Sequence, residues 1–170
     1  MNLQSNDFEL FGLAQQFAQE RTVLDARWKD LQRQAHPDKF VTQGAAAQRL
    51  ALQWSVRINE AYQRLKDPLK RAAYLCELGG VSVNAQGNTG MPMEFLLQQM
   101  QWREALDAAP SPEVLEALRG EVDAAQHQLL QACADQLDVQ HDYAAAAQTV
   151  CALMFIDKFS QNLSHVATNF

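Results

Sequence analysis

Apolar side chains recur at the spacing of an α-helix over most of this 170-residue chain. One stripe in the first half consists of Leu24, Trp28, Leu31 and Ala35. The next stripe consists of Leu50, Trp54, Ile58, Ala61 and Leu65. Mixed steps of three and four residues stay on one face of a helix, whereas they would alternate between the two faces of a strand. We therefore predict an all-α fold, with helices near 7–13, 23–35, 45–66 and 69–78. Thr22 is the expected N-cap of the second helix, and Gly79 is the expected C-cap of the fourth.

The second half of the chain is also helical, and a stretch without periodicity precedes it. Residues 79–92 hold four of the seven glycines, which is typical of a linker. Three helices are predicted beyond it: 93–109, one that starts behind Ser111, and one that Asp142 caps and that ends near residue 165. Short connections between amphipathic helices indicate an antiparallel bundle. The predicted organisation is a domain over 1–78, a linker over 79–92 and a three-helix domain over 93–170.

Charge is divided unevenly between the two halves. Residues 1–78 carry a net charge of +2 and residues 79–170 a net charge of −8, which together give −6. An acidic second half is a poor match for a phosphate backbone, so we expect no nucleic-acid binding. The longest apolar run, residues 150–156, is far shorter than the roughly 20 residues that cross a bilayer. Since residues 1–10 also resemble no secretion signal, we expect neither a membrane-spanning nor an exported protein.

The cysteines and histidines form no pattern typical of a metal site. Cys76, Cys133 and Cys151 cannot all pair within one chain, and they contain no CxxC motif. Unpaired cysteines suit a reducing compartment, so we expect the protein to be cytoplasmic. The histidines outside residue 36 lack metal-ligand spacing, and no paired carboxylate site or glycine-rich phosphate loop is present. We therefore predict no metal, no cofactor and no catalytic residue.

The sharpest local motif is His36-Pro37-Asp38, which lies between two predicted antiparallel helices. Proline restricts the backbone, so His36 and Asp38 are displayed from a turn that has little freedom to lose on binding. The ordinary pKa of histidine, about 6.5, also suits acid–base chemistry, yet no second catalytic group accompanies His36. Alone, such a motif is more often only a turn, and the pattern around it must decide.

Motifs on both sides of this turn resemble a J-domain. They are Phe8 to Leu13 (FELFGL), Leu24 to Ala35, His36 to Phe40 (HPDKF), Ile58 to Tyr62 (INEAY) and Leu65 to Leu75 (LKDPLKRAAYL). Their order and spacing make them specific as a set over residues 7–78. The linker and the acidic bundle, with FLL at 95–97 and REALD at 103–107, extend the match. The whole chain thus resembles the HscB type of J-protein, the co-chaperone of bacterial iron–sulphur cluster assembly.

The resemblance implies two protein partners and no enzymatic activity of the chain itself. One partner is an Hsp70-type ATPase (HscA-like), which the His-Pro-Asp turn would stimulate. The other is the iron–sulphur scaffold protein (IscU-like), which the bundle would hold and deliver, assisting cluster assembly and transfer. The four-cysteine module of eukaryotic relatives is missing, so no zinc role carries over.

Basic residues next to the turn fit the first partner. Lys29 and Arg33 lie opposite the apolar stripe of their helix, and Arg27 flanks it. A basic strip that runs towards the turn suits docking on an acidic groove, although Asp25 and Asp30 dilute it. The alternative is a solvated polar face, since Asp25 and Lys29 form an ordinary i,i+4 pair. The predicted Hsp70-binding residues are His36, Pro37, Asp38, Arg27, Lys29, Arg33 and Lys39.

Two helices of the second half carry more apolar surface than a bundle requires. Leu96, Leu97 and Met100 lie outside the stripe of Phe95 and Trp102. On the last helix, Phe155, Phe159 and Leu163 lie beyond the main stripe. Spacing alone leaves open whether these residues bind a partner or pack internally. The resemblance implies that the scaffold is bound by Leu96, Leu97, Met100, Gln101, Glu104 and Phe155, and Phe159 and Leu163 are assigned to packing. Gln101 and Ala108 stand where the family often has carboxylates.

Three alternative functions lead to different expectations. A general J-protein would bind denatured polypeptides in preference to one folded scaffold. A small helical enzyme that uses His36 and Asp38 would have hydrolase activity as an isolated chain. A purely structural helical protein leaves the basic helix, the His-Pro-Asp turn and the second apolar face without a role.

Overall fold

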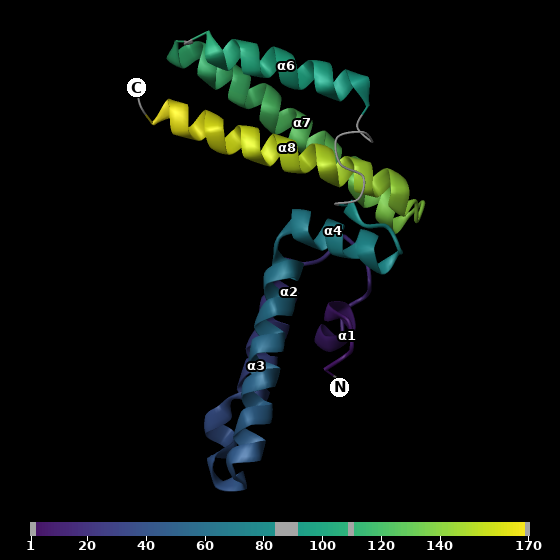
Figure 1. Cartoon of the computed structure of the whole chain (residues 1–170), viewed down its shortest axis with the longest axis vertical. Coiled ribbons are helices and arrows are strands. Elements are labelled where there is room, and N and C mark those ends of the chain that lie inside the picture. Colours follow the sequence, from purple (N-terminus) through teal and green to yellow (C-terminus); the bar gives the residue numbers. More distant parts are fainter. Residues whose placement is uncertain (1–2, 84–91, 109–110, 169–170) are drawn as a thin grey trace. The chain divides into compact units, whose positions relative to one another are not determined.

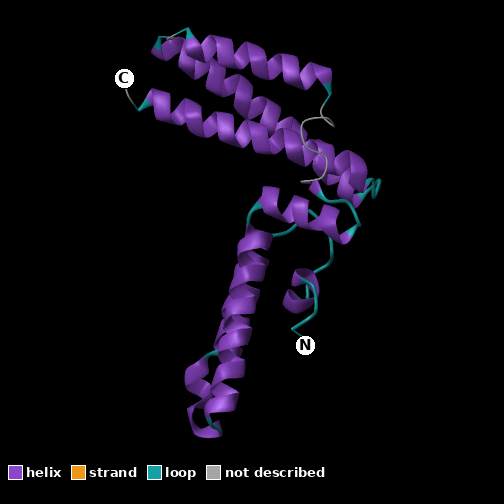
Figure 2. Cartoon of the chain, viewed as in Figure 1, coloured by secondary structure: helices purple, strands orange, loops and turns teal. Residues whose placement is uncertain are grey.

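A computed structural model of the chain describes residues 3–83, 92–108 and 111–168. Within these ranges every regular element is a helix, as the colouring of Figure 2 shows, which confirms the predicted all-α fold. The chain forms two compact units, residues 1–75 and 76–170. The predicted linker falls mostly on residues 84–91, which lie outside the described residues, so the domain limits at 78 and 92 stay predictions.

The first unit is built on a helical hairpin (Figure 1). Its elements are α1 (Asp7–Phe11), α2 (Arg21–Ala35), the 3₁₀ helix η1 (Pro37–Gln43), α3 (Ala45–Lys66) and the larger part of α4 (Pro68–Leu78). α3 has the predicted bounds, and α2 ends directly before His36 and Pro37 as expected, because proline disfavours the α conformation of the residue before it. The expected loop after α2 is instead the 3₁₀ helix η1.

The start of α2 corrects a prediction about its cap. Thr22 is not the N-cap: α2 begins at Arg21, behind Glu20, and no side chain caps it. The first turn is held by the backbone N–H of Leu24, which donates to the Glu20 carbonyl over 3.0 Å. An ion pair between Arg21 and Asp25, one turn apart, adds to it at 2.9 Å.

The apolar side chains between α2 and α3 are buried at one end of the hairpin and partly exposed at the other. Leu24 of α2 and Ile58, Ala61 and Leu65 of α3 are almost fully buried. Leu50 belongs to the same predicted stripe, yet 49% of its surface is exposed. The core of the hairpin therefore ends before the stripe does, close to η1.

A buried carboxylate attaches α1 to α3. The side chain of Asp7 is fully buried and forms ion pairs with Arg57 at 2.8 Å and Arg64 at 2.6 Å. The backbone N–H of Asp7 donates to the Tyr74 hydroxyl over 3.0 Å. A buried charge is tolerated only when it is paired and hydrogen-bonded, so this cluster is a strong constraint on where α1 lies.

The second unit contains α6 (Met93–Asp107), α7 (Pro112–Asp138) and α8 (Tyr143–Ala167). The predicted caps are confirmed: Ser111 accepts a hydrogen bond from the N–H of Val114, and Asp142 accepts one from Ala145. α7 and α8 pack along each other, and α6 is joined to both (Figure 1). Trp102 of α6 stacks on Phe159 of α8 at 5.8 Å between ring centroids. Its indole N–H also donates to Glu121 of α7 over 3.3 Å.

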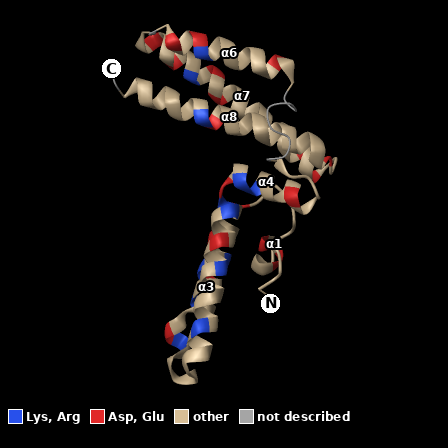
Figure 3. Ribbon diagram, viewed as in Figure 1, with Lys and Arg blue, Asp and Glu red and all other residues tan. Residues whose placement is uncertain are grey.

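The last helix is the most apolar element of the second unit. Asp157 and Lys158 are the charged residues of α8, and Figure 3 shows the rest of it without charge. Ala146, Val150 and Ile156 are fully buried along it. Phe159 and Leu163, assigned to packing from the sequence, are buried as well. A helix with burial on this much of its circumference forms the centre of its unit.

The three cysteines are free and buried in the second unit. Burial raises the pKa of the Cys76 thiol to about 11 and that of Cys133 to about 12. Burial also raises the pKa of Cys151, whose thiol donates to the Val83 carbonyl over 3.6 Å. Since the thiolate is the reactive form, these cysteines serve packing.

Candidate protein-binding sites

The His-Pro-Asp turn is a rigid junction between α2 and η1. His36 ends α2 and caps η1, because its Nδ1 accepts a hydrogen bond from the backbone N–H of Asp38 over 3.2 Å. An imidazole whose Nδ1 accepts a hydrogen bond carries its proton on Nε2, which is left to donate elsewhere. The side chains of both His36 and Asp38 are exposed. The turn thus presents one donor and one carboxylate to solvent from a constrained backbone.

The predicted basic residues are exposed, and the acidic residues among them are engaged with neighbours. Asp25 accepts hydrogen bonds from Arg21 and from the Tyr62 hydroxyl, the latter over 2.6 Å. The hydrogen bond from Tyr62 lowers the pKa of Asp25, and the same bond raises the pKa of Tyr62. Asp30 pairs with Arg33 on the exposed face. The Asp25 carboxylate is therefore directed to α3. Of the two aspartates, only Asp30 reduces the positive charge of the basic strip on α2.

Three of the predicted residues meet around a shallow hollow beside the turn. Arg33, His36 and Lys39 line it together with Gln32. Among the described residues, neither Lys29 nor Lys39 has an ion-pair partner within 4.0 Å. We call this surface the basic hollow. It offers cations and an imidazole donor to an acidic partner surface.

Arg27 lies apart from the basic hollow. A Cβ atom built at Gly12, at the end of α1, would be 3.0 Å from Arg27 Nη1. Arg27 therefore covers the end of α1, although it remains exposed on α2. The structure groups Arg33, His36 and Lys39, and it places Arg27 towards α1.

A row of hydrogen bonds between polar side chains, which we call the polar ladder, joins α2 to α3. The sequence patterns above do not predict it. The Trp28 indole N–H and the Gln32 amide both donate to the Asn59 side chain, over 3.0 and 2.7 Å. The Ser55 hydroxyl donates to Gln32 over 3.0 Å. These residues lie one turn apart on each helix, which is the signal that could have revealed them. Because Gln32 also lines the basic hollow, the ladder sets the position of that surface relative to α3.

A second exposed surface lies on α6. The predicted residues Leu97 and Met100 are 52% and 60% exposed, and Leu96 is partly exposed. Gln101 and Glu104 are exposed on the next turns. Met93 is 69% exposed and lies one turn before Leu97. The sequence predicts Met93 only as the first residue of its helix. Three large apolar side chains on successive turns form an unusual exposed row, which we call the α6 row: Met93, Leu97 and Met100.

Phe155 belongs to α8 and is partly exposed. It lies one turn before Phe159, whose ring stacks on Trp102 of α6. Residues four apart share one side of a helix, so Phe155 lies on the side of α8 that faces α6. The structure therefore brings Phe155 to the α6 side of α8.

The described residues contain no group of three or more His, Cys, Asp or Glu side chains able to hold a metal ion. Over the same residues, no helix has the length and hydropathy that spanning a membrane requires.

Comparisons with known proteins agree with this architecture. The family model described as the HSCB C-terminal oligomerisation domain matches residues 91–164. The Co-chaperone protein HscB homolog of Bordetella petrii is 46% identical, and the match covers 92% of this chain and 93% of that protein. Chaperone HscB from Vibrio cholerae, a solved structure, is 36% identical with a TM-score of 0.83, covering 97% of this chain and 99% of that chain. The human co-chaperone HscB structure supports the fold alone, at 23% identity and a TM-score of 0.88 over 96% of this chain and 83% of that one.

The relatives match nearly the whole length of the chain, at identities well above those that similar folds reach by chance. At these coverages the matches take in both the helical hairpin and the C-terminal helices. The chain therefore belongs to the HscB co-chaperone family.

Proposed function

We propose that this chain stimulates the ATPase of an Hsp70-type chaperone (HscA-like) and delivers an iron–sulphur scaffold protein (IscU-like) to it. The first unit would bind the chaperone through His36, Pro37, Asp38, Lys29, Arg33 and Lys39, with Arg27 at the edge of the contact. The second unit would bind the scaffold through Leu96, Leu97, Met100, Gln101, Glu104 and Phe155. The chain contributes contacts, and the ATPase site belongs to the partner. We also propose the cytoplasm as the compartment, because all three cysteines are free thiols.

The observation that carries this proposal is the construction of the His-Pro-Asp turn. The turn has a capped backbone, exposed His36 and Asp38 side chains, and the basic hollow beside it. A surface held in its binding conformation loses little entropy on docking, and its cations steer it towards a carboxylate-rich partner. Preferential binding to one conformation of the chaperone would shift that chaperone towards the state that hydrolyses ATP.

The deciding experiment measures the steady-state ATPase rate of the Hsp70-type chaperone with this chain and the scaffold, added singly and together. We expect stimulation by the chain and more than additive stimulation by both. His36→Gln should abolish stimulation and leave helix content unchanged, because it removes the imidazole and retains the backbone. His165→Gln, at the exposed end of α8, is the matched control and should behave as the wild type.

The outcomes separate this proposal from its alternatives. Full stimulation by His36→Gln would show that the turn is not the stimulating group. Stimulation without any effect of the scaffold, together with binding of denatured polypeptides, would favour a general J-protein. ATP hydrolysis by the isolated chain would favour an enzyme.

A further inference from the structure

The sulfur atoms of this chain are divided unevenly between its two units. Apart from Met1, which lies outside the described residues, the first unit contains neither methionine nor cysteine. The second unit holds the other four methionines and all three cysteines. Thiols and thioethers are the side-chain groups that peroxides oxidise in a stepwise, partly reversible way. Mild oxidation of this chain therefore acts on the second unit.

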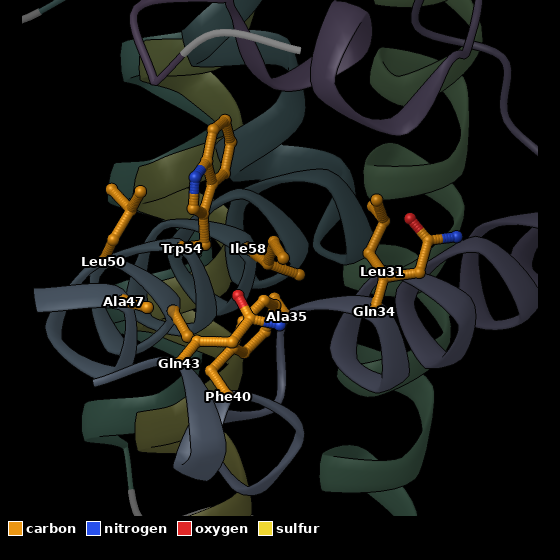
Figure 4. A pocket seen from close by; sticks show the side chains of 10 residues that line it. Leu31, Gln34, Ala35, Phe40, Gln43, Ala47, Leu50, Trp54 and Ile58 are labelled. Atoms are coloured by element: carbon orange, nitrogen blue, oxygen red, sulfur yellow. The ribbon is translucent and has the colours of Figure 1, made fainter. Parts of the chain in front are cut away.

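The surfaces described on the first unit have no sulfur for such an oxidant to attack. At the end of the hairpin next to η1 lies a cavity of about 400 Å³, lined by aliphatic and aromatic side chains such as Leu31, Phe40 and Trp54 (Figure 4). No Met or Cys is among the described residues that line this cavity or the basic hollow. Stimulation of the chaperone by the chain alone should therefore survive treatment with a peroxide.

The three cysteines of the second unit are protected from oxidation. All of them are buried, and burial raises the pKa of Cys76 to about 11 and that of Cys133 to about 12. The thiolate is the form that reacts, and thiols with such pKa values are almost entirely protonated near neutral pH. A thioether has no proton to lose, so its exposure governs how readily it is oxidised. The exposed methionines are therefore the sulfur atoms that an oxidant reaches first.

Exposed methionines form both ends of the α6 row. Met93 is 69% exposed and Met100 is 60% exposed, whereas Met154 of α8 is 39% exposed. Met93 and Met100 are about two helical turns apart, so they lie on one face of α6 with Leu97 between them. Two of the three apolar side chains of the α6 row can thus be oxidised, and Leu97 cannot.

Oxidation changes the polarity of this row without changing the backbone. The thioether sulfur donates an electron pair to one oxygen of hydrogen peroxide, the O–O bond breaks, and the other oxygen leaves as water with both protons of the peroxide. The sulfur is oxidised to a sulfoxide and the peroxide is reduced. A sulfoxide is polar, so it loses hydration when a partner protein covers it. A favourable apolar contact becomes a cost of desolvation.

We propose that Met93 and Met100 are modification sites, where oxidation by a peroxide to the sulfoxide weakens binding of the scaffold and reduction of the sulfoxide restores it. The inference rests on the proposed function and adds redox control to the scaffold-binding surface. Methionine sulfoxide can be reduced enzymatically, so the modification is reversible. Because Leu97 keeps its apolar side chain, binding is weakened and not abolished.

The test oxidises the full chain with hydrogen peroxide and measures scaffold binding by calorimetry. Peptide mass spectrometry verifies the added oxygen on Met93 and Met100. We expect the dissociation constant of the scaffold to rise by about tenfold, the effect of losing one buried apolar contact. Methionine sulfoxide reductases for both epimers should restore the affinity. A thiol reductant alone should not restore it, because it reverses disulfides and sulfenic acids only.

A matched pair of variants identifies the methionines responsible. In Met93→Leu combined with Met100→Leu, both side chains stay apolar and cannot be oxidised, so peroxide treatment should not change the affinity of this variant. In Met154→Leu, the α6 row keeps its thioethers, so treatment should weaken binding as much as in the wild type. Each variant is compared with its own untreated sample, which removes any effect of the substitution itself.

The outcomes separate this inference from the proposed function. Wild-type affinity that is unchanged after complete oxidation of Met93 and Met100 overturns the inference and leaves the proposed function standing. An equal loss of affinity in the leucine double variant also overturns it, because the sensitive group then lies elsewhere. Loss of the stimulation by the chain alone would mean general damage and overturn it too. Absence of scaffold binding before any treatment overturns the proposed function and the inference with it.

Discussion

At the scale of single residues, the two carboxylates Asp7 and Asp30 show how burial decides the importance of an ion pair. Asp7 is fully buried between Arg57 and Arg64, and it holds α1 against α3. Asp30 pairs with Arg33 on the exposed face of α2. Exposed pairs contribute about 0–1 kcal/mol, whereas removal of one partner from a buried pair leaves an uncompensated charge.

We predict that Asp7→Asn lowers the free energy of unfolding of the first unit by about 3 kcal/mol. This is the low end of the range for a buried pair, because the side chain of Arg64 is 40% exposed. Asp30→Asn is the matched control and should cost less than about 1 kcal/mol. Urea unfolding in a Trp102→Phe background, where only Trp28 and Trp54 fluoresce, measures both. Equal stabilities of the two variants would contradict a constraining role of Asp7.

At the scale of elements, the end of α4 depends on a pair of glycines. Gly80 has φ +89°, and the N–H groups of Gly80 and Val81 donate to the carbonyls of Glu77 and Cys76. This is the Schellman arrangement, and Gly79 is its cap residue, as the sequence predicted. Gly79 has a second role that the sequence does not reveal. A Cβ atom there would lie 2.4 Å from the ring of Tyr143, the first residue of α8.

We predict that Gly79→Ala destabilises the second unit by about 1–3 kcal/mol, because the methyl group forces the Tyr143 ring away. Gly120→Ala is the control with the opposite sign. Gly120 lies inside α7 with open space around it, so alanine should stabilise the helix by about 0.5–1 kcal/mol. Thermal unfolding compares the two variants. Wild-type stability of Gly79→Ala would show that the Tyr143 ring can move away from residue 79 at no cost.

At the scale of the whole molecule, the proposed function needs both surfaces on one chain. A chain that binds chaperone and scaffold together raises the effective concentration of one at the other without any new contact. The basic hollow belongs to the unit of residues 1–75, and the α6 row belongs to the unit of residues 76–170. The two surfaces can therefore be removed one at a time.

We predict that Leu97→Ala combined with Met100→Ala abolishes the additional stimulation by the scaffold and leaves the stimulation by the chain alone unchanged. Both side chains are exposed, so alanine removes the contact surface without opening a cavity, and it favours the helix. Val114→Ala, an exposed apolar residue of α7, is the control. ATPase rates with and without scaffold provide the measurement. Retained additional stimulation would place the scaffold site away from the α6 row.

Local signals in the sequence predicted much of this architecture. The bounds of α3 follow from its apolar period and from the proline after Asp67, and the starts of α7 and α8 follow from Ser111 and Asp142. All of these depend on residues within a few positions of one another. The exposed face of α6 was predicted in the same way, from helical geometry.

What only the tertiary structure decided depends on contacts between residues far apart in the chain. The ladder from Trp28 to Asn59, the burial of Asp7 between two arginines and the fit of Gly79 against Tyr143 each join residues of different elements. The open cavity below η1 likewise exists because three elements fail to close over Leu50. The sequence by itself determined the helices, their caps and the motifs of the family, because these are local and follow from backbone geometry. Packing determined which polar groups pair and which apolar groups stay uncovered, because both depend on distances that only the folded chain sets.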